Sequence, residues 1–189
     1  FTLGEGQGYT EDDIKEGARS LTGFTRVDDA FYFNQRNHDS DSKNLLGRRG
    51  DFNGDDFVDL IFRRPSAATF ITEKLYRFFV NDAPGELDKT QQRFVRSLAA
   101  LLKDRQWELK PILRRLFKTK HFYDESNTGS LIKSPIQLIV QTIRSLRTPP
   151  DRSVSLLVDA AGVMGQRIFF PPNVKGWDGG RAFRRITFL

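Results

Sequence analysis

The 189-residue chain lacks cysteine and has no apolar run long enough to cross a bilayer or to form a signal peptide. The absence of cysteine excludes disulfides, thiolate metal sites and a cysteine nucleophile, and it fits a reducing or an oxidising compartment equally well. The absence of a long apolar run predicts a protein that does not span a membrane. A chain of this length can bury a core that folds without covalent or metal staples.

The familiar catalytic fingerprints are also missing. There is no GxSxG, Walker A or Rossmann pattern, because the glycine-rich opening LGEGQG follows no strand and is completed by no lysine. The stretch DFNGDDFVD, residues 51–59, resembles a calcium loop, but its glycine is fourth rather than sixth and Phe62 replaces the glutamate at the twelfth position. We interpret it as a turn at Asn53-Gly54 followed by acidic capping of a helix.

Charge is unevenly distributed along the chain. Residues 1–60 carry 13 acidic and 7 basic side chains, whereas residues 61–189 carry 11 acidic and 23 basic ones. This polarity predicts either that the acidic segment packs on the basic body, or that a basic surface is left for an anionic partner. We favour the first, because most scattered lysines and arginines lie on the solvated faces of amphipathic helices.

The spacing of apolar residues predicts a mainly α fold: one domain over residues 1–189, a bundle of about six to eight helices with one short β-hairpin near the N-terminal third. Thr10 is expected to cap a helix that runs to Leu21, and Ser134-Pro135 to open another. The runs at Phe31–Asn34 and Lys43–Leu46 are expected to pair as the hairpin. The other helices are expected at about 55–64, 67–79, 87–102, 109–117 and 154–164.

A polar loop holds the first candidate site. His38, Asp39 and Asp41 supply one imidazole and two carboxylates, which are ligand types for zinc or another divalent metal. His38 and Asp39 are also the candidate catalytic pair, for acid–base work. Because no second histidine or HExxH spacing lies nearby, we expect local hydrogen bonds here and no cofactor, and we keep a metal as the alternative.

The second candidate site is a basic helix face over residues 108–120. Its outer side carries Arg114, Arg115, Lys118 and Lys120, which are candidates for binding an anionic polymer such as a polysaccharide. We do not expect nucleic acid to be the partner.

The third candidate is the stretch PPNVKGWDGG, residues 171–180. Pro171, Pro172 and Gly176 predict a rigid turn that fixes Trp177 in one orientation. As a plug, the indole would cover the end of the helical core. As a platform, it would stack on a sugar or base while Lys175 and Asp178 made polar contacts. We favour the plug.

Several motifs occur in an order that resembles the C-terminal half of a large bacterial family, domain of unknown function 1800 (DUF1800). They include FTLGEG, LTGF, KLYRFFV, LIKSP and PPNVKGW, and they cover nearly the whole chain. The most specific are Leu131–Pro135 and Met164–Ala182. The family's His-Asp, lysine and Leu-Gly positions match His38, Asp39, Lys43, Leu46 and Gly47. This chain departs from the family at Asp41, where glycine is usual, and at Phe183, where a second tryptophan is usual.

The resemblance implies an exported protein in the periplasm, at the cell surface or secreted. It also implies a missing N-terminal part of the same protein as one partner, and another exported protein as a second. It implies no reaction.

Three functions therefore stand as hypotheses. The first is a non-catalytic interaction or scaffold module, the second a hydrolase or other metal-assisted enzyme centred on His38-Asp39, and the third a binder of anionic polymers through the basic helix face.

Overall fold

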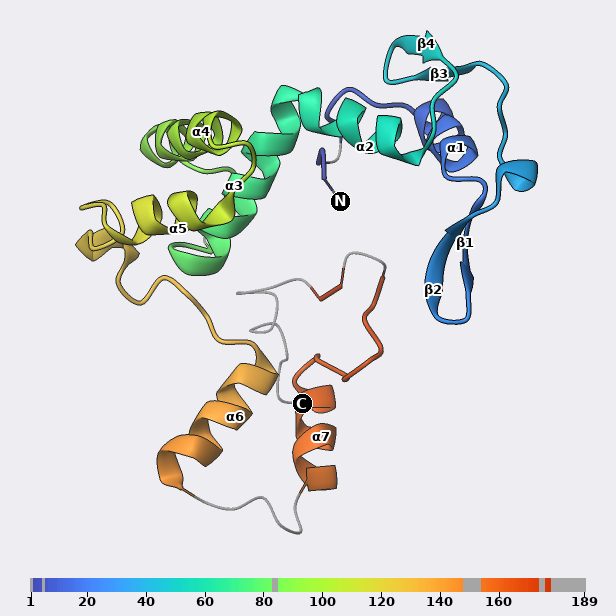
Figure 1. Ribbon diagram of the computed structural model, residues 1–189. Coiled ribbons are helices and arrows are strands. Elements are labelled where there is room, and N and C mark those ends of the chain that lie inside the picture. Colours follow the sequence, from blue (N-terminus) through green and yellow to red (C-terminus); the bar gives the residue numbers. More distant parts are fainter. Residues whose placement is uncertain (1, 5, 83–84, 148–153, 174–175, 178–189) are drawn as a thin grey trace. The chain divides into compact units, whose positions relative to one another are not determined.

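The computed structural model describes residues 2–4, 6–82, 85–147, 154–173 and 176–177 (Figure 1). Over these residues the chain forms seven α-helices and two short antiparallel β-hairpins, which confirms the mainly α fold predicted from the sequence. The chain divides into two compact units, residues 1–71 and 72–189, which are described in turn.

The first unit begins with helix α1 (Glu11–Ser20). Thr10 caps it as predicted: its hydroxyl accepts a hydrogen bond from the Asp13 amide, and the Asp13 carboxylate accepts one from the Thr10 amide. This reciprocal capping satisfies two amides that the helix itself leaves without partners. Helix α1 then presents Glu16 and Arg19 on one side, because residues three apart lie on the same face.

Two hairpins follow, rather than one. Strands β1 (Phe24–Val27) and β2 (Ala30–Phe33) pair with each other, and β3 (Lys43–Leu45) pairs with β4 (Arg48–Gly50). The prediction that Phe31–Asn34 pairs with Lys43–Leu46 is therefore wrong. The physical reason is a two-residue turn in each hairpin, Asp28-Asp29 and Leu46-Gly47, in which both residues have positive φ. Such turns match the twist of paired strands and join neighbours in sequence.

Helices α2 (Gly54–Arg63) and α3 (Pro65–Phe79) are separated at Pro65, as the sequence predicts. Arg64 is extended, with ψ of 131°, because a residue before proline avoids the helical region. Asn53 caps α2 and Asp56 completes the reciprocal bond, which confirms the capping interpretation of the acidic stretch. The core of this unit is small and consists of Leu3, Leu45, Leu60, Ala67 and Ala68.

The second unit comprises the end of α3 and helices α4 (Lys89–Asp104), α5 (Leu109–Phe117), α6 (Pro135–Leu146) and α7 (Val154–Val163). Its buried apolar residues concentrate on α3, just after its end, and on α4 and α5: Tyr76, Val80, Val95, Leu98, Ala99, Leu102, Ile112 and Leu116. The expected stripe on α3 was partly wrong, because Phe78 is 66% exposed and Tyr76 is buried instead. Ser134 caps α6, with Pro135 in its first turn. A short 3-10 turn lies at Glu125–Asn127 in this unit, and another lies at Gln35–Asn37 in the first unit.

Helices α6 and α7 contact each other but bury little. Only Pro135 of α6 and Ala161 of α7 are buried. No helix within the described residues is long and apolar enough to cross a membrane.

Candidate functional site: the polar network around His38 and Asp39

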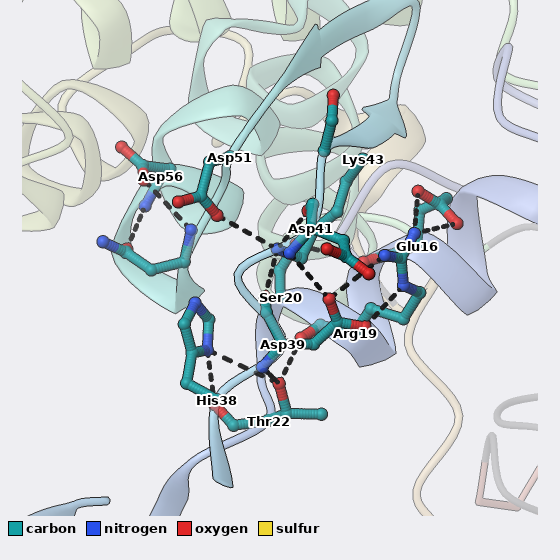
Figure 2. Close-up of polar contacts among 12 residues, drawn as sticks. Glu16, Arg19, Ser20, Thr22, His38, Asp39, Asp41, Lys43, Asp51 and Asp56 are labelled. Atoms are coloured by element: carbon teal, nitrogen blue, oxygen red, sulfur yellow. Dashed lines mark hydrogen bonds and ion pairs between the residues drawn. The ribbon is translucent and has the colours of Figure 1, made fainter. Parts of the chain in front are cut away.

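Asp39 is held by an arginine that sequence reasoning did not single out. Arg19 of α1 donates from Nε to Asp39 Oδ2 over 2.8 Å and from Nη2 to Asp39 Oδ1 over 3.1 Å (Figure 2). The same guanidinium donates from Nη1 to both carboxylate oxygens of Glu16, each at 3.0 Å. All three side chains are partly shielded from solvent, with exposed fractions between 21% and 32%. The loop that carries Asp39 is thereby fastened to α1.

This arrangement fixes both carboxylates in their ionised form. The hydrogen bonds from Arg19 lower the pKa of Asp39 to about 2. The pKa of Glu16 is lowered first by a hydrogen bond from the Asn44 backbone amide, over 2.9 Å, and then by Arg19. A carboxylate that is ionised at all ordinary pH values and accepts bidentate bonds from arginine is a poor general acid or base.

The His38 side chain is held by a hydrogen bond to the backbone of Thr22. Its Nδ1 lies 2.9 Å from the Thr22 carbonyl oxygen, so Nδ1 carries the proton and donates. The Thr22 hydroxyl in turn accepts from the Asp39 backbone amide over 2.8 Å. Figure 2 shows the imidazole and the Asp39 carboxylate pointing in different directions. No hydrogen bond joins the two side chains, and Nε2 is left without a hydrogen-bond partner among the described residues.

Lys43 is completely buried. Its ammonium group donates to the carbonyl oxygens of Asp39 and Asp41, at 2.5 and 3.1 Å, and to the Asp51 carboxylate at 3.3 Å. A buried ammonium persists only where its donors are all satisfied, and these three acceptors meet that requirement. The loop is therefore held by two cations: the buried Lys43 binds its backbone carbonyls, and the partly exposed Arg19 binds the Asp39 carboxylate.

The Leu46-Gly47 turn is tied to both neighbouring helices. The Leu46 amide donates to Asp13 Oδ1 over 2.5 Å, and its carbonyl accepts from Arg64 over 3.1 Å. Burial raises the pKa of Asp13, but the hydrogen bonds from Thr10 and Leu46 outweigh it, so the pKa is lowered overall. Of the positions that match the DUF1800 pattern here, His38, Asp39, Lys43 and Leu46 all form hydrogen bonds to other groups of the chain.

The third member of the metal hypothesis, Asp41, contributes its backbone rather than its carboxylate. Its amide donates to Asp39 Oδ1 over 3.0 Å and its carbonyl accepts from Lys43. Within the described part of the chain, no three histidine, aspartate or glutamate side chains come together as a metal site.

The basic face keeps its predicted exposure. Arg114 and Arg115 lie on α5, and Lys118 and Lys120 follow its end; all four are exposed and form no ion pair with described residues. Helix α5 itself contains no acidic residue. The face can therefore attract an anion, and the anionic-polymer hypothesis stays a prediction.

The Trp177 stretch is only partly described. Pro171 and Pro172 are exposed, and the Gly176 amide closes a turn on the Asn173 carbonyl over 3.1 Å, with a Gly176 φ of 92°. Trp177 is half-buried. Lys175 and Asp178 lie outside the described residues, so the choice between plug and platform stays a prediction.

A second polar cluster in the core of residues 72–189 was also missed from the sequence. The Tyr76 hydroxyl lies 2.9 Å from Nε2 of His121, and the two rings stack. Burial raises the pKa of Tyr76 to about 12, so its hydroxyl remains protonated and can donate to the imidazole. Nearby, Asn127 bonds the His121 carbonyl and receives a hydrogen bond from Asn81. The 45-residue separation of Tyr76 and His121 gives no local signal that could have revealed the pair.

Comparison with known proteins identifies the family of this chain. The family described as Protein of unknown function (DUF1800) matches residues 1–188. No curated protein and no solved structure matches the chain.

Proposed function

The chain belongs to the DUF1800 family of proteins of unknown function, and we propose that it serves as a non-catalytic protein-binding module of an exported bacterial protein. The proposal rests on exposed apolar residues of helices α6 and α7. We call this the α6–α7 apolar surface, and define it by six exposed residues: Leu138, Leu146, Val154, Leu156, Val158 and Val163.

Helix α7 carries the argument. Its sequence VSLLVDAAGV contains one charged residue, Asp159, and apolar residues lie on almost every side of it. A helix that is apolar all round is normally surrounded by protein, because each exposed aliphatic side chain forgoes about 1.5–3 kcal/mol of burial. Here Leu156 is 68% exposed and Val163 is 75% exposed. A partner that covers this helix would recover that free energy.

The polar network supports the non-catalytic part of the proposal. The Arg19, Asp39 and Lys43 side chains all bond to other groups of the chain. Catalysis requires a nucleophile, acid or base that reaches a substrate, usually with a second group that orients it. Nε2 of His38 and the exposed Asp41 carboxylate are open, but the His38 ring is oriented by the Thr22 carbonyl and the Asp39 carboxylate is engaged by Arg19. The network is better suited to holding the loop on α1.

The partner that we propose is a protein, either another part of the same polypeptide or another exported protein. Sparse charge on α7 argues against an anionic polymer on this surface, which would require a basic one.

Site-specific photo-crosslinking tests the proposal in the cells that encode the protein. A photoreactive residue at Leu156 should give discrete crosslinks, within the polypeptide or to one other protein, that mass spectrometry can map. The same residue at Ser97, exposed on α4, is the matched control. Val163→Glu should abolish the Leu156 crosslinks without lowering Tm, because Val163 is exposed. Crosslinking at Leu156 no stronger than at Ser97 would refute the proposal.

A further inference from the structure

A groove within residues 72–189 lies between α3, the segment 131–134 and α6. Its volume is about 1380 Å³. The segment belongs to the motif LIKSP, residues 131–135, which the polar network does not explain. Lys133 is exposed, Ser134 caps α6, and the Gln166 side chain accepts a hydrogen bond from the Ile136 amide over 3.0 Å. These bonds fix the start of α6 beside the groove.

The wall of the groove is apolar and open to solvent. Phe78 is 66% exposed, and Leu131 and Val140 are 44% and 45% exposed. All three line the same groove although they come from different segments, so they form one surface rather than three scattered residues. A monomeric protein rarely leaves such a patch uncovered.

The charged residues of the groove are mostly basic. Lys74, Arg77, Lys133 and Arg144 line it, against the single acid Asp82. Arg77 is paired with Glu73 over 2.9 Å, whereas Lys133 and Arg144 form no ion pair with described residues. Lys133 also stands next to the N-terminal end of α6, where the helix dipole is positive and a cation is unfavourable. An anionic group in the groove would relieve this repulsion.

We propose that this groove binds an acidic amphipathic helix of a protein partner. The inference rests on the proposed protein-binding function and specifies one surface and one partner chemistry. The apolar face of the helix would pack on Phe78, Leu131 and Val140, and its acidic flank would face Lys133 and Arg144. An α-helix is about 10 Å in diameter, so a few turns of one helix have a volume of the same order as that of the groove. Such a segment is the common occupant of an apolar groove with a charged edge.

The experiment places a photoreactive residue at Gln141, an exposed groove residue, and compares it with the one at Leu156. The crosslinked segment is mapped by mass spectrometry. We expect a segment with apolar residues at helical spacing and an excess of acids. The double variant Lys133→Glu/Arg144→Glu should lower the Gln141 crosslink yield about tenfold, since reversing two contacts costs about 1.4 kcal/mol.

The matched control is Arg93→Glu/Arg96→Glu, which makes the same charge change on exposed residues of α4 and should leave the yield unchanged. Crosslinking at Leu156 but not at Gln141 would overturn the groove proposal alone, and crosslinking at neither would overturn the protein-binding function as well. A basic or neutral segment, a nucleic acid, or a yield that ignores the Lys133/Arg144 reversal would also overturn the groove proposal.

Discussion

The loop from His38 to Asp51 and the α6–α7 apolar surface differ in composition and in how many of their side chains have partners within the chain. The loop is dense in charge, and Asp39, Lys43 and Asp51 all bond to other groups of the chain. The surface has few charges, and most of its apolar side chains meet water. The difference shows that the charged side chains of the loop are held largely by hydrogen bonds within the chain, whereas the apolar side chains of α6 and α7 are left exposed among the described residues.

Free energy explains why the two regions differ in this way. A buried cation costs several kcal/mol unless every donor finds an acceptor, so a charged residue such as Lys43 constrains its surroundings strongly. An exposed leucine costs much less, because it resembles its state in the unfolded chain. An apolar surface can therefore stay exposed until a partner binds, whereas a buried charge needs its hydrogen-bond partners within the folded chain.

Removing the buried cation should have the largest effect. Lys43→Ala leaves the carbonyls of Asp39 and Asp41 without their donor and opens a space beneath the loop, so the free energy of unfolding should fall by about 3 kcal/mol. Lys15→Ala on α1, which removes an exposed lysine with surface ion pairs only, should cost about 0.5 kcal/mol or less. Urea unfolding measures both. Equal losses in the two variants would show that the buried Lys43 ammonium stabilises the loop no more than an exposed lysine does.

Much of the fold was predictable because its signals are local. Helix caps such as Thr10 and Ser134, and the break at Pro65, depend on residues within four positions of each other. The hairpins were only half predictable. The runs that form β2 and β3 were predicted, but β1 and β4 were not, and Asp28-Asp29 does not resemble the usual Asn-Gly turn, so the pairing of β1 with β2 was missed.

The candidate site was less predictable than the fold, because its bonds join distant residues. His38 and Asp39 were identified, yet their partners Thr22 and Arg19 lie 16 and 20 residues earlier. The one usable signal was the spacing of Glu16 and Arg19, which places both on the side of α1 that faces the loop. Sequence alone could not tell whether Asp39 would meet an arginine or a metal.

Acid should weaken the network before it affects the helical core of residues 72–189. The pKa values of Asp39, Glu16 and Asp13 are lowered in the folded chain, so their ionised forms stabilise it above their ordinary pKa values, near 4. This stability is lost as pH falls from about 5 toward 2. The urea midpoint should therefore drop over that range. Asp39→Asn should be less stable at pH 7 and show a smaller drop.

The control for that titration is Asp41→Asn, in the same loop, whose side chain is exposed and whose contacts come from its backbone. It should retain both the stability and the acid dependence of the parent. A pH profile of Asp39→Asn that matches the parent would show that the Arg19 contact does not stabilise the loop.

Substitution of His38 should give the smallest effect, and it tests whether the open Nε2 atom binds a metal. Nδ1 donates to Thr22, so the open Nε2 offers a single ligand, and the nearest carboxylate in sequence, that of Asp39, is occupied by Arg19. One imidazole binds a divalent metal weakly, since tight sites need three or four ligands. We therefore expect elemental analysis to find no stoichiometric metal, and zinc to raise the Tm of neither the parent nor His38→Ala. About one metal per chain, lost in His38→Ala, would show that the loop rearranges to bind it and would return the metal-assisted enzyme to first place.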